Sequence, residues 1–235
     1  MPVVPVGEVA AVRELMRAGL SALDATALTI ADVTAELASQ VGFSLLTLVL
    51  VMAAGLDAWR LVGLSGLAGS VAIFAGCAWV QHSGGCRLAR LCGRATPLLH
   101  GVPDVWEHLD ARLRRIYARH GRVALAVAIH LAAWFAGGLQ AWAVLRIMGT
   151  PIAPATALAL EAFVASICTV VPTPGALGVQ EGSYVLAGSA LGIDSSAALA
   201  LSLVKRARDL LVALPVIIVW QAIQIRRARR AHGHA

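Results

Sequence analysis

Residues 155–192, ATALALEAFVASICTVVPTPGALGVQEGSYVLAGSALG, contain two short apolar segments separated by a cluster of prolines and glycines. The segment 155–171 is apolar apart from Glu161, and the segment 180–192 carries Glu181. At a rise of about 1.5 Å per residue, both are short for a hydrocarbon core of about 30 Å. The break between them ends a helix, because proline and glycine at this density interrupt it. Two thin spans and a re-entrant hairpin both remain open. The hairpin is favoured, because broken backbone is tolerated at depth where it lines a cavity.

The next apolar segment, residues 195–224, contains four charged residues: Lys205, Arg206, Arg208 and Asp209. If the segment is helical, Lys205 lies about 22 Å along the axis from the tryptophan near its end. The cluster is therefore predicted to lie deep in the membrane, not at the headgroup level. Cations in a spanning helix are costly, and they normally face a partner or a water-filled cavity.

The spacing of these charges suggests how they are compensated. Asp209 follows Lys205 by four positions and Arg206 by three, so one face of a helix pairs them internally. Arg208 points elsewhere and needs another partner. We expect that partner to be one of the two glutamates of the interrupted region.

Two roles remain open for the charged cluster. In the first, ion pairs between helices only lock the bundle. In the second, the cluster forms a cationic cavity that receives a polar or anionic lipid headgroup. The surplus of positive charge favours the second role unless Glu161 and Glu181 both neutralise it. Free backbone N–H groups at a helix start after the loop 175–178 would also favour an anion.

The rest of the chain predicts a single transmembrane domain over residues 1–235. We expect a helical or re-entrant first signature at 1–40, two spans at 41–82, a cytoplasmic basic loop at 83–122, spans with the proline–glycine break at 123–224, and a cytoplasmic tail at 225–235. The predicted fold class is all-α, a polytopic membrane helical bundle with re-entrant broken helices and, as a further option, an internal repeat.

Arginines are concentrated in the loop 83–122 and in the tail, and basic segments stay in the cytoplasm. This predicts a multi-pass protein of the cytoplasmic (inner) membrane with a cytoplasmic C-terminus. In the loop, Trp106, Leu109, Leu113 and Ile116 recur at spacings of three and four. The pattern predicts an amphipathic helix along the membrane surface, whose basic face is solvated or touches anionic headgroups.

Composition excludes several classes of protein. The 235 residues are 59% hydrophobic and 14% charged, with a mean hydropathy of +0.78, which is too apolar for a soluble domain. The net charge of +6 comes from clustered arginines, without the basic, aromatic-interleaved face of a nucleic-acid-binding module. No Cys-x2-Cys or paired-histidine motif predicts a metal site, and we expect no cofactor. No nucleophile–base pair appears, so the sequence does not predict an enzyme.

A weak internal repeat has an offset of 173 residues. It pairs Glu8 with Glu181, Gly19 with Gly192, and Glu36 with Asp209. Paired, interrupted hydrophobic helices are typical of transporters built from repeats. Chance similarity in a sequence rich in alanine, leucine and valine is the alternative.

The stretches VVPTPGALGVQEGSYVLAGSALGI (170–193) and ALSLVKRARDLLVALPVIIVWQ (200–221) resemble the hopanoid-biosynthesis-associated membrane proteins. These belong to the wider superfamily of the flippase-like transmembrane region of lysylphosphatidylglycerol synthases. PVVPVGEVAAVREL (2–15) is similar to the first signature of that family. The resemblance implies that the motif residues are Pro174, Gly175, Gly178, Glu181, Lys205, Arg206, Arg208 and Asp209. The family usually has further spans before this first signature, so we expect a truncated N-terminus. We expect no aminoacyltransferase domain within residues 1–235, so the resemblance is not extended to lipid aminoacylation.

The leading hypothesis is that the protein handles or translocates a lipid. The resemblance implies a hopanoid or a related polyisoprenoid-derived lipid. The alternatives are an intramembrane enzyme that acts on a lipid headgroup, with Glu161 and Glu181 as its acid and base, and a membrane scaffold for a lipid-biosynthesis complex. The expected partners are membrane lipid, anionic headgroups and, for the scaffold, lipid-biosynthesis proteins.

Overall fold

The computed structural model describes residues 5–55, 60–84, 102–171, 173 and 176–232. Its elements are α1 (Pro5–Arg17), α2 (Ala22–Ala53), α3 (Arg60–Trp79), the π-helical turn η2 (Val80–Gly84), α5 (Val102–Tyr117), α6 (His120–Ile147), α7 (Pro154–Val170), α8 (Val179–Ala190) and α9 (Ser195–His232). No strand occurs in these ranges, which confirms the all-α prediction.

Among the described residues, three helical segments are long and apolar enough to cross a membrane: α2, α3 with its extension to His82, and α6. Large apolar side chains such as Leu61, Leu125 and Ile129 lie on the outside of the molecule and are more than half exposed. A soluble protein rarely exposes so much apolar surface, whereas lipid solvates it. These features confirm the predicted membrane helical bundle.

Helix α2 joins two regions that the sequence analysis treats separately. Residues 22–40 lie in the same helix as the span predicted to begin at residue 41. Ser21 caps the helix, and its Oγ accepts a hydrogen bond from the backbone N–H of Asp24 at 3.1 Å. No proline occurs between this cap and the end of α2, so nothing interrupts the backbone hydrogen bonds.

Small residues bring α3 against α7 and α2. A Cβ added to Gly66 would lie 3.3 Å from the backbone N and Cα of Phe163 in α7. The hydroxyl of Ser70 in α3 lies 2.8 Å from that of Ser166 in α7 and 3.1 Å from that of Ser44 in α2. In lipid, close approach and buried hydroxyl contacts replace the hydrophobic effect as the forces between helices.

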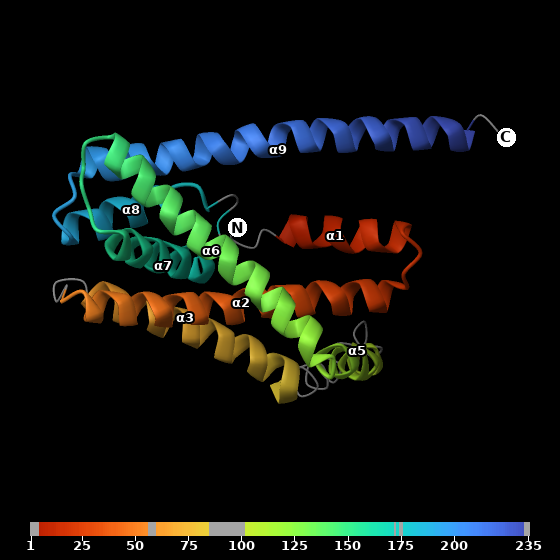
Figure 1. Ribbon diagram of the computed structural model, residues 1–235. Coiled ribbons are helices and arrows are strands. Elements are labelled where there is room, and N and C mark those ends of the chain that lie inside the picture. The colour runs from red at the N-terminus through yellow and green to blue at the C-terminus, as the bar shows by residue number, and fades with distance from the viewer. Residues whose placement is uncertain (1–4, 56–59, 85–101, 172, 174–175, 233–235) are drawn as a thin grey trace.

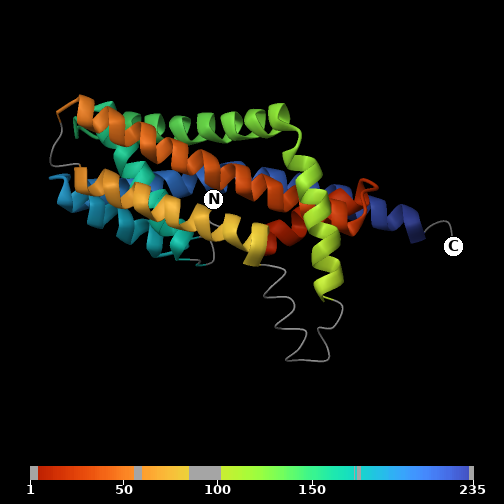
Figure 2. The ribbon, with the colours of Figure 1, turned by 90° about the horizontal axis from the view of Figure 1, so that it is seen from below.

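Helix α5 crosses the bundle at one end (Figure 2). The sequence predicts an amphipathic helix along the membrane surface, which would turn its apolar stripe toward lipid. The structure shows the stripe facing α2. Leu109 and Leu113 are buried against Ala27 of α2, and Trp106 and Ile116 pack around them. An alanine-rich surface on α2 accepts the stripe, and the amphipathic pattern does not distinguish such a surface from lipid.

Helices α7 and α8 form an antiparallel hairpin. Figure 1 shows α7 running from one end of the molecule to its middle, and α8 running back to the same end. Neighbouring α2 and α9 extend much further along the bundle. The end of α7 therefore lies partway along the long helices, which is the geometry expected of a re-entrant hairpin.

The helix boundaries agree with the predicted repeat. Arg17 and Ala190 end α1 and α8, while Ala22 and Ser195 begin α2 and α9, and both pairs of positions differ by 173 residues. The glycines at 19 and 192 both have positive φ values, +97° and +70°. In Figure 1, α1 and α8 run in opposite directions, and so do α2 and α9. The two helix pairs are therefore inverted in direction relative to each other, which agrees with the predicted repeat.

Candidate functional site

A cavity of about 490 Å³ lies where the two helix pairs meet, and α6 and α7 complete its lining. Its charged lining residues are Glu8, Glu36, Glu161, Lys205, Arg206, Arg208 and Asp209. Charged side chains inside a bundle with an apolar exterior make this cavity the candidate functional site.

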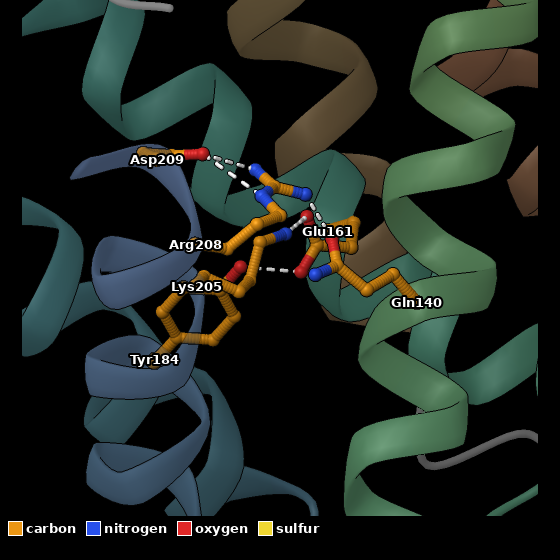
Figure 3. A network of polar contacts seen from close by, with 6 residues as sticks. All are labelled: Gln140, Glu161, Tyr184, Lys205, Arg208 and Asp209. Carbon is orange, nitrogen blue, oxygen red and sulfur yellow. Dashed lines mark hydrogen bonds and ion pairs between the residues drawn. The ribbon is translucent and has the colours of Figure 1, made fainter. Parts of the chain in front are cut away.

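The deepest part of the charged wall is a cluster of three side chains from three helices (Figure 3). Lys205 of α9 forms an ion pair with one carboxylate oxygen of Glu161 in α7, and the hydroxyl of Tyr184 in α8 donates to the other. All three residues are buried, with exposures of 7% or less. The Lys205 ammonium also lies 5.7 Å from the centre of the Tyr184 ring. This cluster joins the hairpin to α9.

A second ion pair ties the break between α7 and α8 to α9. The guanidinium of Arg206 donates to Oε1 of Glu181 at 2.8 Å. The other oxygen of Glu181 accepts from the backbone N–H of Gly178 at 2.8 Å, which satisfies a free donor at the start of α8. Gly178 has a φ of +79°, in the left-handed region that favours glycine. Glu181 thus fixes both the helix start and the position of Arg206.

The third pair is the most exposed of the three. Arg208 donates to Oδ1 of its neighbour Asp209, from Nε at 2.9 Å and from Nη2 at 2.5 Å. Its Nη1 donates to the side-chain carbonyl of Gln140 in α6. The side chains of Arg208 and Asp209 are 41% and 35% exposed, compared with 8% and 9% for Lys205 and Glu161. This pair is therefore the part of the cluster most accessible to a ligand.

The predicted pairing within α9 is wrong. Asp209 pairs with Arg208, whereas Lys205 and Arg206 pair with the glutamates of α7 and α8. Long cationic side chains reach neighbouring helices, and sequence spacing within one helix does not reveal those contacts. Each of the three cations therefore has a carboxylate, and the predicted surplus of positive charge is absent from the cluster.

Two charged lining residues, Glu8 of α1 and Glu36 of α2, were not predicted as site residues. The cavity therefore contains both signs of charge and is not cationic. The repeat offset was the signal that could have identified them, because it pairs Glu8 with Glu181 and Glu36 with Asp209.

Of the other predicted site residues, one is described by the structure and two are not. Gly178 lies at the start of α8, beside the cavity-lining Gln180. Pro174 and Gly175 lie outside the described residues, as do two of the four cysteines, Cys86 and Cys92.

Two polar residues of α6 have structural partners in α2. His130 lies 3.2 Å from Asp32, and the indole N–H of Trp134 donates to Ser39 at 3.1 Å. Within the described residues, no group of three or more histidine, cysteine, aspartate or glutamate side chains is placed to hold a metal ion.

One comparison with known proteins shows the family of the chain. The family model described as "Lysylphosphatidylglycerol synthase TM region" matches residues 1–217. The match includes both inverted helix pairs except the last part of α9, and it contains every charged residue of the cavity. No curated protein and no solved structure matches the chain.

Proposed function

The chain belongs to the family of lysylphosphatidylglycerol synthase transmembrane regions, membrane proteins that act on lipids, and we propose that it translocates a lipid whose headgroup enters the cavity. The observation that carries this proposal is the row of three ion pairs along one wall of a cavity inside an apolar bundle. A bundle that needed only stability would be served by apolar packing, because desolvating buried ion pairs is costly.

The depth of the charges supports this proposal. Lys205 lies ten positions after the start of α9, or about 15 Å along the helix. That distance is about half the thickness of a hydrocarbon core. A polar headgroup that crosses the membrane needs polar partners at this level, where lipid tails offer none.

The inverted arrangement of the helix pairs supports movement as well as binding. Transporters built from inverted repeats bind their substrates near the membrane midplane, beside interrupted helices. Here the two helix pairs run in opposite directions (Figure 1), and the cavity receives residues from both pairs. Small rigid-body movements of one pair against the other would open the cavity to alternate sides.

The charges that line the cavity suggest the kind of headgroup. Carboxylates and paired cations both line the cavity. A headgroup that carries hydrogen-bond donors or a cation as well as acceptors or an anion would meet partners for both. The sequence resemblance favours a hopanoid or a related polyisoprenoid-derived lipid with such a polar group.

The ends of the helices suggest an orientation. Helix α5 and the C-terminal end of α9 lie at the same end of the molecule (Figure 1). Both belong to arginine-rich sequence, so we place this end, with the C-terminus, in the cytoplasm.

The test is transfer of a labelled lipid across proteoliposome membranes by purified protein. Two fluorescent lipids are used, an analogue of a hopanoid with a polar side chain and an analogue of a zwitterionic phospholipid. The transfer rate of each is measured for wild type, for Arg208→Gln and for the control Arg17→Gln. Both arginines pair with a carboxylate of their own helix, but Arg17 lies outside the cavity. We expect Arg208→Gln to lower the transfer rate at least about tenfold, which corresponds to about 1.4 kcal/mol, and Arg17→Gln to leave it unchanged.

Transfer that is equal in both variants, or no faster than in protein-free vesicles, would overturn the proposal. Lipid is also extracted after transfer and identified by mass spectrometry. Unchanged lipid is expected of a translocator, whereas a chemically altered headgroup would indicate the intramembrane enzyme instead.

A further inference from the structure

A second cavity, of about 400 Å³, lies between α2, α5 and α6. Its charged lining residues are Asp24, Asp32, Arg112, Arg115, Arg119 and Arg122. We propose that this cavity binds the phosphate headgroup of an anionic phospholipid as a fixed component of the protein, separate from the lipid that the protein moves.

Charge favours an anion at this site. Nε of Arg112 donates to Asp24 at 2.5 Å, and Asp32 lies 3.2 Å from a histidine of α6. Four arginines in the lining thus meet two aspartates, and both aspartates already have partners. Arg115 of α5 and Arg119, the N-cap residue of α6, both line the cavity and are exposed. Guanidinium groups bind phosphate oxygens in pairs, with more directional contacts than an ammonium group makes.

The backbone adds to this preference. Helix α6 begins at His120, and its N-cap residue Arg119 makes no side-chain capping bond. The first turn of a helix carries free N–H groups and the positive end of the helix dipole. The cavity includes Arg122 and Val123 of this first turn, whose own N–H groups donate to the carbonyl of Arg119. The backbone therefore contributes the positive end of the helix dipole, which favours the same anion as the arginines.

The position of the cavity suits a headgroup. Helices α2 and α6 are candidate membrane spans, and the cavity lies near their first residues, Ala22 and His120. The start of a span is where phosphate groups of the bilayer lie. Basic pockets between membrane helices at this level bind anionic lipids.

The remaining lining distinguishes a lipid from free phosphate. Ala27, Leu28 and Ala31 of α2, with Ile116 of α5 and Val123 of α6, give the cavity an apolar wall below the arginines. Inorganic phosphate gains nothing from such a wall, whereas the glycerol and upper acyl chain of a phospholipid bury apolar surface against it. An amphiphile therefore fits the cavity better than a free ion.

The experiment measures lipid that stays bound after purification. Protein is reconstituted in vesicles of equal phosphatidylglycerol and phosphatidylcholine and extracted into detergent, and the retained lipids are quantified by mass spectrometry. The test variant is Arg115→Gln/Arg119→Gln/Arg122→Gln. The control, Arg13→Gln/Arg17→Gln/Arg114→Gln, removes the same charge from arginines that do not line this cavity.

We expect wild-type protein and the control to retain phosphatidylglycerol in preference to phosphatidylcholine. In the test variant, the ratio of retained phosphatidylglycerol to retained phosphatidylcholine should fall about fivefold for each arginine removed. Because the arginines are partly solvated, the wild-type preference should also decrease as salt is raised. That second measurement needs no variant.

Equal preference in the test variant and the control, or a wild-type preference that salt does not change, would overturn the proposal. Inorganic phosphate is added as a competitor in a further sample. If it removes the bound phosphatidylglycerol, the lipid assignment fails and the site recognises phosphate alone.

Discussion

Lys205 and Glu161 form an ion pair inside the bundle although they lie 44 positions apart in the sequence, and each side chain is less than a tenth exposed. The pair joins α9 to α7 and forms the innermost part of the cavity wall. Removing one partner leaves an isolated charge, whereas removing both leaves polar or apolar groups that the interior tolerates better.

The first prediction concerns this pair. Lys205→Met should lower the free energy of unfolding by about 3 kcal/mol, because Glu161 is left buried without its cation. The double variant Lys205→Met/Glu161→Gln should recover most of that loss, since glutamine still accepts a hydrogen bond from Tyr184. Thermal unfolding in detergent measures both. A single variant as stable as wild type would show that the pair contributes nothing.

The second prediction concerns the contact between α3 and α7. Gly66→Val should lower stability by about 1–3 kcal/mol, because the new side chain overlaps the backbone of Phe163. Gly76→Val is the matched control on the same helix, since a Cβ there meets nothing within 4 Å. The difference in unfolding midpoint between the two variants is the measurement, and equal midpoints would argue against close packing at Gly66.

The third prediction concerns the docking of α5 at high pH. Burial raises the pKa of Tyr117 above its ordinary value, although its hydrogen bond to Thr34 opposes that shift. The phenol oxygen lies 3.2 Å from the hydroxyl of Thr34, and its single O–H donates to the nearer acceptor, Oε1 of Gln81 in η2, at 2.6 Å. Because the pKa of Tyr117 is higher in the folded protein than in the unfolded chain, its phenol contributes its full stabilisation below the unfolded pKa of about 10. That contribution is lost as the pH rises through the pKa of the folded protein.

The variant Tyr117→Phe isolates this effect. We expect wild type to unfold at a higher temperature than Tyr117→Phe at pH 8, because only wild type keeps the hydrogen bond to Gln81, and the difference to shrink above about pH 10. A difference that is constant with pH would mean that Tyr117 does not titrate with unfolding.

Much of the fold could be predicted from the sequence. Apolar runs and their breaks predict the helices, and the repeat offset agrees with the observed helix ends at 17 and 190 and starts at 22 and 195. Local rules predict such features because they depend on residues close in sequence. The continuity of α2 through residue 40 was harder to predict, because Asp32 and Glu36 resemble the polar edge of a span.

The partners of side chains could not be predicted in the same way. The amphipathic pattern of α5 predicts a buried stripe but not that α2 covers it. Likewise, four-residue spacing suggested that Asp209 pairs with Lys205, but Glu161, a distant residue, takes that place. Contacts between helices depend on their relative placement, and one sequence without relatives to compare contains little information on that placement.

The most direct test of the central claim is to ask whether lipid occupies the charged cavity. A photoreactive amino acid is placed at Ala213, which lines the cavity, or at Leu211, which lies on the same helix and is 73% exposed. Each is combined with Arg208→Gln, and lipid crosslinked in native membranes is quantified. If a headgroup is held in the cavity, Arg208→Gln will lower crosslinking at position 213 severalfold and leave position 211 unchanged. A ratio of the two yields that does not respond to Arg208→Gln would contradict the account.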